Sequence, residues 1–207
     1  MSSCARQPKK TTGSIAILGD SWAVGPAPGQ PNLSDGFNSL GLPNVLITPG
    51  LTTSGDVLTF LQNYINGGGT GAAYSFALIS TGGDDMIQGI PATTTQNNLV
   101  AIGAACTTLG VRCVIPDVPQ IIMNGNKVTM PAKNAAPFYI NAENQCANIM
   151  ILDDQVWQIV QHMPDYAVSY VAPDYENVAY SADVPHYNAA GANAYAAGLW
   201  AIYSQLP

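Results

Sequence analysis

The chain has 207 residues, of which 47% are hydrophobic and 9% are charged, and this composition is typical of a globular α/β protein rather than of a disordered one. Its formal net charge is −7 and its only basic run is the pair Lys9-Lys10, which excludes nucleic-acid binding through phosphate contacts. No run of about 18 apolar residues is present, so no transmembrane segment is predicted.

Residues 1–12 are polar, carry three of the six basic residues, and predict a flexible N-terminal arm ahead of one domain over residues 13–207. Within this arm, Ser2-Ser3-Cys4-Ala5 resembles the end of a bacterial lipoprotein signal, in which the cysteine becomes lipidated. That interpretation favours a secreted, periplasmic or lipid-anchored protein whose signal has been trimmed. The alternative is a disordered start with an incidental cysteine.

After the arm, short apolar runs alternate with longer helical patterns, as in a parallel sheet with crossover helices. Strands are predicted at Ser14–Leu18, Val45–Thr48, Phe76–Thr81, Arg112–Asp117 and Ala167–Val171. Helices are predicted near Ser54–Ile65, Thr94–Leu109, Asn141–Gln161 and Asn188–Tyr203. The segment from Pro116 to Pro137 has no clear pattern, and it is interpreted either as a wall of the substrate site or as a lid without chemical importance.

The four cysteines, Cys4, Cys106, Cys113 and Cys146, do not have the spacing of metal ligands. Cys106 and Cys113 flank a predicted helix-to-strand turn and could approach each other. The sequence leaves a bridge between them open, with buried free thiols as the default expectation.

Two parts of the sequence point to chemistry at the sheet edge. Gly19-Asp20-Ser21 closes the first predicted strand and delivers a serine to the edge where open α/β sheets place their sites. Asp183-Val-Pro-His186 supplies a base and a group to orient it. The alternative for Asp183 and His186 is a helix-capping aspartate beside an incidental histidine. His162, next to Met163-Pro164, is interpreted as a charge at a helix end.

The chain resembles the SGNH (GDSL-type) hydrolase superfamily, and most closely its bacterial thioesterase/arylesterase branch. The resemblance rests on four blocks in the family's order: Gly19-Asp20-Ser21, Pro49-Gly50 through Gly55, Thr81-Gly-Gly-Asp-Asp85 continuing to Gly89, and Asp183-Val-Pro-His186 followed by Asn188 and Gly191. It implies a three-layer α/β/α sandwich with a five-stranded parallel sheet, flavodoxin-like in type.

The resemblance also implies the role of each residue. Ser21 is the nucleophile, His186 is the general base, and Asp183 orients the imidazole. The backbone N–H groups of Ser21 and Gly50 are oxyanion donors, although Gly50 has the alternative interpretation of a simple turn glycine. No metal or other cofactor is implied.

Asp84 departs from the family pattern, which has an asparagine as the third oxyanion donor. An ionised carboxylate accepts hydrogen bonds and cannot donate them, so it would repel a developing oxyanion. Two explanations are open: Asp84 is protonated in a poorly solvated pocket, with Asp85 adding like-charge pressure, or it acts on another group of the substrate.

The sequence therefore predicts a serine hydrolase that cleaves small carboxylic esters or thioesters through an acyl-enzyme. The alternatives are a carbohydrate O-acetyl esterase and a non-catalytic binding protein on the same scaffold, which Asp84 makes plausible. A flavodoxin-like cofactor binder is disfavoured because no Gly-x-Gly-x-x-Gly or Walker pattern follows the first strand. The natural substrate and the oligomeric state are not predicted.

Overall fold

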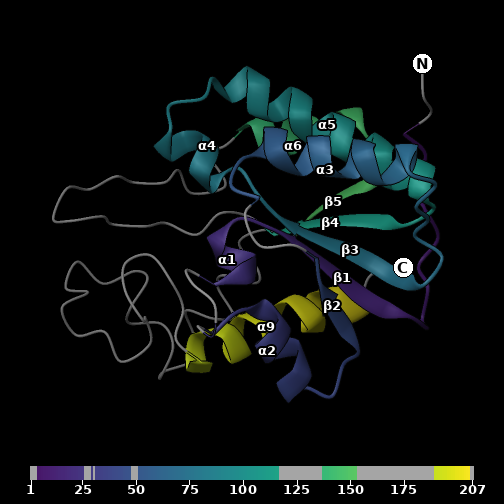
Figure 1. The fold of residues 1–207 in the computed structure, drawn as a ribbon, viewed down its shortest axis with the longest axis vertical. Coiled ribbons are helices and arrows are strands. Elements are labelled where there is room, and N and C mark those ends of the chain that lie inside the picture. The colour runs from purple at the N-terminus through teal and green to yellow at the C-terminus, as the bar shows by residue number, and fades with distance from the viewer. Residues whose placement is uncertain are drawn as a thin grey trace, which may run out of the picture.

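A computed structural model describes residues 4–25, 29, 31–47, 51–116, 137–152 and 189–205. Five parallel strands form one sheet in the order β2-β1-β3-β4-β5 (Figure 1). Their bounds are β1 Ser14–Gly19, β2 Asn44–Leu46, β3 Tyr74–Ser80, β4 Arg112–Pro116 and β5 Ile149–Leu152. The predicted five-stranded parallel sheet is confirmed.

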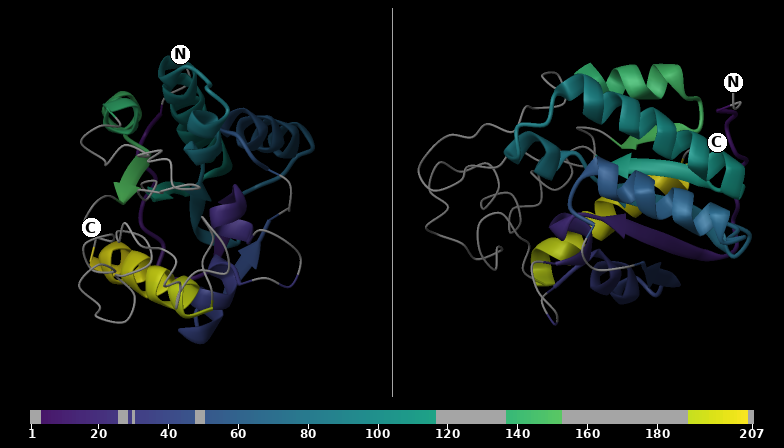
Figure 2. Two further views of the ribbon diagram at one scale, coloured as in Figure 1. Left: turned by 90° about the vertical axis from the view of Figure 1, so that its left-hand side faces the viewer. Right: turned by 45° about the horizontal axis from the view of Figure 1, so that its top comes forward.

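Helices cover both faces of this sheet (Figures 1 and 2). On one face α3 (Ser54–Asn66) packs against α5 (Ala92–Leu109), and α5 packs against α6 (Pro137–Gln145). On the other face α2 (Leu33–Ser39) packs against α9 (Ala189–Gln205). Two short helices, α1 (Ser21–Val24) and α4 (Gly83–Ile87), follow the carboxyl ends of β1 and β3. The architecture is the predicted three-layer α/β/α sandwich.

The central strands are buried on both sides, as expected for a parallel sheet between two helical layers. All residues of β1 except Ser14 are buried, and all residues of β4 are buried. The register pairs Gly19, the last residue of β1, with Ser80, the last residue of β3. These two strands therefore end side by side.

The predicted helix over Asn141–Gln161 is wrong at residues 146–152, and its remainder, 153–161, lies outside the described residues. Helix α6 ends at Gln145, and the chain then forms strand β5 at Ile149–Leu152. A short apolar run such as Ile-Met-Ile-Leu fits a buried strand and a buried helix equally well, so periodicity did not separate them. The strand predicted at Ala167–Val171, and most of the unpatterned segment from Pro116 to Pro137, lie outside the described residues.

The short connection between α6 and β5 has its own polar support. The buried Asn148 side chain donates hydrogen bonds to the carbonyl oxygens of Gly103 (3.2 Å) and Val111 (3.0 Å). Gly103 leaves room for this approach, because a Cβ atom there would overlap Cys146 and Ile149. The amide therefore joins the β5 side of the sheet to α5.

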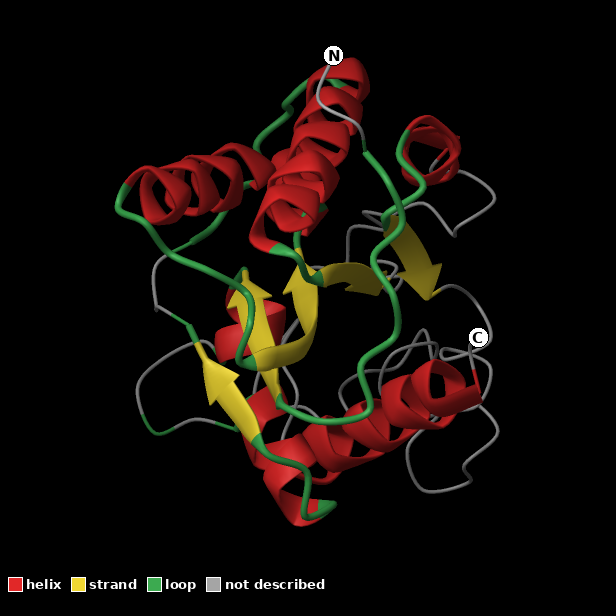
Figure 3. Cartoon of the chain, turned by 90° about the vertical axis from the view of Figure 1, so that its right-hand side faces the viewer, coloured by secondary structure: helices red, strands yellow, loops and turns green. Residues whose placement is uncertain are grey.

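The N-terminal segment expected to form a flexible arm is attached to the domain at several points. Cys4 forms a disulfide with Cys146, with 5.1 Å between their Cα atoms. The Gln7 backbone N–H donates to Asn148 Oδ1 (3.0 Å), and Arg112 Nε donates to the Gln7 carbonyl (3.0 Å). Figure 3 shows this segment as a loop along the amino end of the sheet.

The disulfide bears on two expectations about cysteines. It uses the Cys4 sulfur that a lipid thioether would require, so this structure and lipidation at Cys4 exclude each other. Cys106 and Cys113 are free and buried, as the default expectation has it. A hydrogen bond to Cys106, together with burial, raises the pKa of the Cys113 thiol, which disfavours its reactive thiolate form.

None of the helices in the described part of the chain is long and apolar enough to cross a membrane.

Candidate active site

Ser21 lies at the carboxyl edge of the sheet because β1 ends two residues before it. Gly19 has a φ of 138°, and a Cβ atom at this position would collide with the carbonyl oxygen of Ser80. Glycine therefore allows β1 and β3 to approach closely at the point where the chain turns out of the sheet. Ser21 follows as the first residue of α1, with its side chain half-buried.

Asp20 joins this turn to the end of β3. Its backbone N–H donates to the Ser80 carbonyl (2.9 Å), and its Oδ1 accepts a hydrogen bond from Ser80 Oγ (3.0 Å). Both residues are buried. The aspartate of the Gly-Asp-Ser block thus fixes the backbone beside Ser21, which is a structural role.

Asp84 follows the neighbouring strand, so the structure places it at the same edge as Ser21. Strand β3 ends at Ser80, the chain turns through Thr81 and Gly82, and Asp84 lies half-buried in the first turn of α4. The hydroxyl of Tyr139, on α6, donates to the Thr81 carbonyl (2.8 Å). Figure 1 shows α1 and α4 at the same end of the sheet.

Asp85, the next residue, is fully buried and joins three helices. Its Oδ1 accepts from the Ser54 backbone N–H (2.8 Å), and its Oδ2 accepts from the hydroxyls of Ser54 and Thr95 (the latter at 2.8 Å). Asn98 Nδ2 adds a hydrogen bond to Ser54 Oγ (2.9 Å). From its place in the sequence, Asp85 is expected only to add a like charge beside Asp84. Its hydrogen bonds instead make it a buried link between α3, α4 and α5.

The start of α3 is also fixed by a capping box. The Thr53 side chain accepts from the Asp56 N–H, and the Asp56 carboxylate accepts from the Thr53 N–H. Hydrogen bonds from the Thr53 backbone and then from the Thr52 and Thr53 side chains hold the pKa of Asp56 below its usual range. The capping box and Asp85 together fix the chain directly after residues 48–50, the segment that contains Gly50.

The predicted site residues divide into two groups. Ser21 and Asp84 follow the ends of adjacent strands. Gly50, Asp183 and His186 lie outside the described residues, so their roles stay predictions. The region that is described contains no group of three or more side chains able to hold a metal ion.

Comparisons with known proteins give matches in structure only. No protein-family model matches the chain, and no curated protein matches its sequence. Among solved structures, the psychrotrophic esterase EstA from Pseudoalteromonas, inhibited by monoethylphosphonate, is 17% identical with a TM-score of 0.61, over 93% of this chain and 97% of that one. A lipolytic protein of the G-D-S-L family from Veillonella parvula is 16% identical with a TM-score of 0.62, over 94% and 100%.

The chain has the GDSL (SGNH) hydrolase fold. TesA matches it as well, at 12% identity and a TM-score of 0.59 over 91% of this chain and 97% of TesA. Each of these GDSL-fold structures is covered almost completely, so the likeness extends over the whole domain. Because the three scores are so close, the placement nearest to the thioesterase/arylesterase branch stays a prediction.

Proposed function

We propose that this protein is a serine hydrolase that cleaves small carboxylic esters or thioesters. The observation that carries the proposal is the position of Ser21, directly after β1 and beside the end of β3, in a chain with the GDSL-hydrolase fold. This edge is where open α/β sheets bind their ligands. A serine held there by the Asp20–Ser80 hydrogen bonds has a fixed backbone from which to attack a bound carbonyl.

In the proposed reaction, Ser21 Oγ attacks the carbonyl carbon while His186 accepts the serine proton. The tetrahedral intermediate collapses to an acyl-enzyme, and the proton on His186 passes to the departing alcohol or thiol. Water then attacks the acyl-enzyme with the same histidine as base, which releases the acid and restores Ser21. Asp183 accepts a hydrogen bond from the other imidazole nitrogen throughout.

The direction of α9 supports the assignment of His186. The last turns of α9 lie beside the amino ends of the strands, where Trp200 and Tyr203 line one cavity with Gly13 and Ser75. A 17-residue helix is about 25 Å long, comparable to the length of the strands. Helix α9 therefore starts near the carboxyl edge, and His186 precedes its first residue, Ala189, by three residues.

Asp84 is proposed to lower the rate at neutral pH because a carboxylate replaces an oxyanion donor. The Asp84→Asn variant should then have a higher kcat, and the gain should grow with pH as the wild-type carboxyl ionises. The measurement is kcat/KM for both proteins from about pH 5 to 9, around the reference pKa of histidine. Equal profiles, or a slower asparagine variant, would show that Asp84 does not face the oxyanion.

Asp84 also favours a second candidate function, a non-catalytic binding protein on a hydrolase scaffold, because its carboxylate takes the place of an oxyanion donor. A carbohydrate O-acetyl esterase would use the same groups as the first candidate and differ in substrate. Turnover of p-nitrophenyl acetate by the wild type separates enzyme from binding protein, and acetylated oligosaccharides test the carbohydrate alternative.

The test of the proposed function compares Ser21→Ala with Ser39→Ala on p-nitrophenyl acetate. Ser39 is an exposed serine at the end of α2, so its change is a matched control. We expect kcat to fall by a factor of at least about 10³ in Ser21→Ala and to stay unchanged in Ser39→Ala. Residual activity in Ser21→Ala within tenfold of the wild type would reject Ser21 as nucleophile.

The Cys4–Cys146 disulfide supports an oxidising location, such as the periplasm or the cell exterior, because disulfides persist in such compartments.

A further inference from the structure

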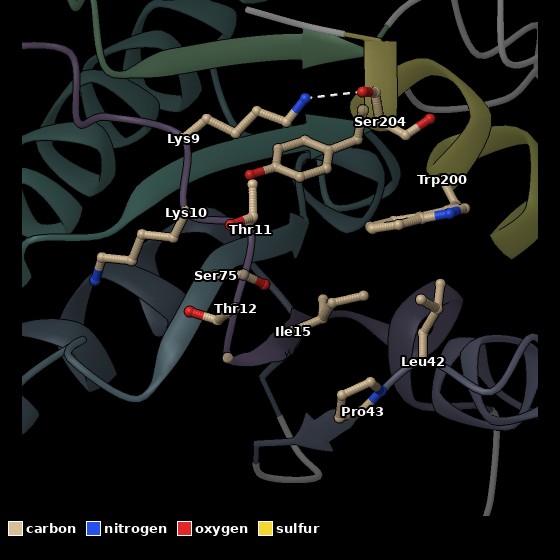
Figure 4. A pocket seen from close by; sticks show the side chains of 12 residues that line it. Lys9, Lys10, Thr11, Thr12, Ile15, Leu42, Pro43, Ser75, Trp200 and Ser204 are labelled. Carbon is tan, nitrogen blue, oxygen red and sulfur yellow. Dashed lines mark hydrogen bonds between the residues drawn. The ribbon is translucent and has the colours of Figure 1, made fainter.

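A cavity of about 550 Å³ lies at the amino end of the sheet, opposite the edge that carries Ser21 (Figure 4). The first residues of β1 and β3, the loop before β2, the last turns of α9 and the N-terminal segment all contribute to its lining. Its volume is within the range of small-molecule sites, about 300–1,000 Å³. The proposed hydrolysis does not use this cavity.

The lining combines an apolar wall with a basic rim. Ile15, Leu42 and Trp200 supply apolar surface from three different elements, and Figure 4 shows the Trp200 ring extending from α9 on the same side as these side chains. Among the described residues of the lining, Lys9 and Lys10 are the charged ones, and none is Asp or Glu. In a chain with a net charge of −7, this is a local reversal of charge.

The two lysines have different roles in the structure. Lys9 Nζ donates to the Ser204 carbonyl (2.8 Å) and lies 5.6 Å from the centre of the Tyr203 ring, so it holds the N-terminal segment against α9. Lys10 Nζ donates to the Gly71 carbonyl at 3.4 Å, which is long for a hydrogen bond. Lys10 can therefore turn toward an anion without losing a strong contact.

Tyr203 provides a further polar group in the lining. Its side chain is buried, its ring centre is 3.9 Å from that of Phe76, and its hydroxyl has no hydrogen-bond partner in the described part of the chain. Burial raises the pKa of Tyr203, so the hydroxyl remains a donor at neutral pH. A donor without a partner, in a cavity whose lining also includes Lys9 and Lys10, favours an acceptor of negative charge as the ligand.

We propose that this cavity binds a small amphiphilic carboxylate, with its apolar chain against Ile15, Leu42 and Trp200 and its carboxylate at the Lys10 rim. An alkyl cation would be repelled by the lysines, and a neutral alcohol would gain only the apolar contact. The site is separate from Ser21, so the inference does not depend on the proposed hydrolysis.

The experiment titrates the Ser21→Ala protein with hexanoate, octanoate and decanoate while recording tryptophan fluorescence. We expect a saturable change in fluorescence that is lost in Ser21→Ala/Trp200→Phe. Trp22 and Trp157 remain in that variant and would still report binding at any other site near them. Each added methylene should tighten binding about fourfold while it is buried. No saturable change, or the same change without Trp200, would overturn the proposal.

Charge is tested separately. Lys10→Gln should weaken octanoate binding about two- to fivefold, the range for a partly exposed ion pair. Asn97→Asp alters the net charge equally at an exposed position of α5, and it should leave binding unchanged. Octyltrimethylammonium should bind at least tenfold more weakly than octanoate. Equal binding of the two, or no effect of Lys10→Gln, would reject the carboxylate as ligand.

Discussion

Replacing Asp85 with alanine should lower the free energy of unfolding by about 3–5 kcal/mol. The change removes the acceptor of three donors: the backbone N–H and hydroxyl of Ser54 and the hydroxyl of Thr95. A buried donor without a partner costs about 1–3 kcal/mol. The two hydroxyl groups can rotate toward other acceptors, whereas the Ser54 N–H cannot. The total cost of the three donors is therefore lower than three times the upper cost of one unpaired donor. Ser54 and Thr95 are themselves buried, which limits rescue by solvent.

Urea unfolding measures this change in free energy, and a double-mutant cycle attributes part of it to the hydrogen bond between Asp85 and Thr95. Thr95→Val removes one donor, so Asp85→Ala in that background should cost at least about 0.5 kcal/mol less than in the wild type. A loss below 1 kcal/mol for Asp85→Ala, or an additive cycle, would refute the reasoning that these bonds hold the three helices together.

The same link should matter for activity because Asp85 fixes the start of α3, after Gly50, and the start of α4, beside Asp84. We expect Asp85→Asn, which keeps the shape of the side chain, to lower kcat at least tenfold. The matched control is Asp35→Asn, which alters a capping box on α2 and should reduce stability without reducing kcat. Equal kcat values in the two variants would limit Asp85 to a role in stability.

Two further predictions concern stability. Cys4→Ser should lower the free energy of unfolding by up to about 5 kcal/mol, since the disulfide closes a loop of 142 residues. Reduction of the wild type with dithiothreitol should reproduce that loss in urea titrations. An unchanged urea midpoint would contradict the prediction. Because the pKa of Asp56 is lowered in the folded state, its carboxylate stabilises the fold above about pH 4, and this contribution is lost as the pH falls below that value. The free energy of unfolding of Asp56→Asn should therefore depend less on pH between 5 and 3 than that of the wild type. Parallel pH profiles of the two proteins would argue against the cap.

The sequence predicted those parts of the molecule that depend on local pattern. The first four strands were located within two residues at each end, because each is an apolar run bounded by turn residues. Gly19-Asp20-Ser21 was correctly placed at the sheet edge for the same reason. Strand β5 was missed because it consists of four consecutive apolar residues shortly after a helix, and such a run has neither the helical nor the strand periodicity of hydrophobic residues.

Other features depend on residues that meet only in the folded chain. Asp85 is joined to Ser54 and Thr95, which are 31 and 10 residues away, and no spacing rule predicts that meeting. Cys4 and Cys146 are 142 residues apart, so neither sequence distance nor local pattern favoured their bridge over any other pairing. Asp84, by contrast, was recognisable as unusual from sequence because a block of known pattern surrounds it.

The most direct test of Ser21 as the nucleophile is labelling by a serine-reactive phosphonate, followed by intact-mass measurement and peptide mapping. The structure of EstA, which shares the fold, is of the enzyme inhibited by monoethylphosphonate. We expect one phosphonyl group per chain, located on Ser21, with parallel loss of esterase activity and no label in Ser21→Ala. Absence of labelling in the wild type, or a label that persists in Ser21→Ala, would contradict the assignment of Ser21 as the nucleophile.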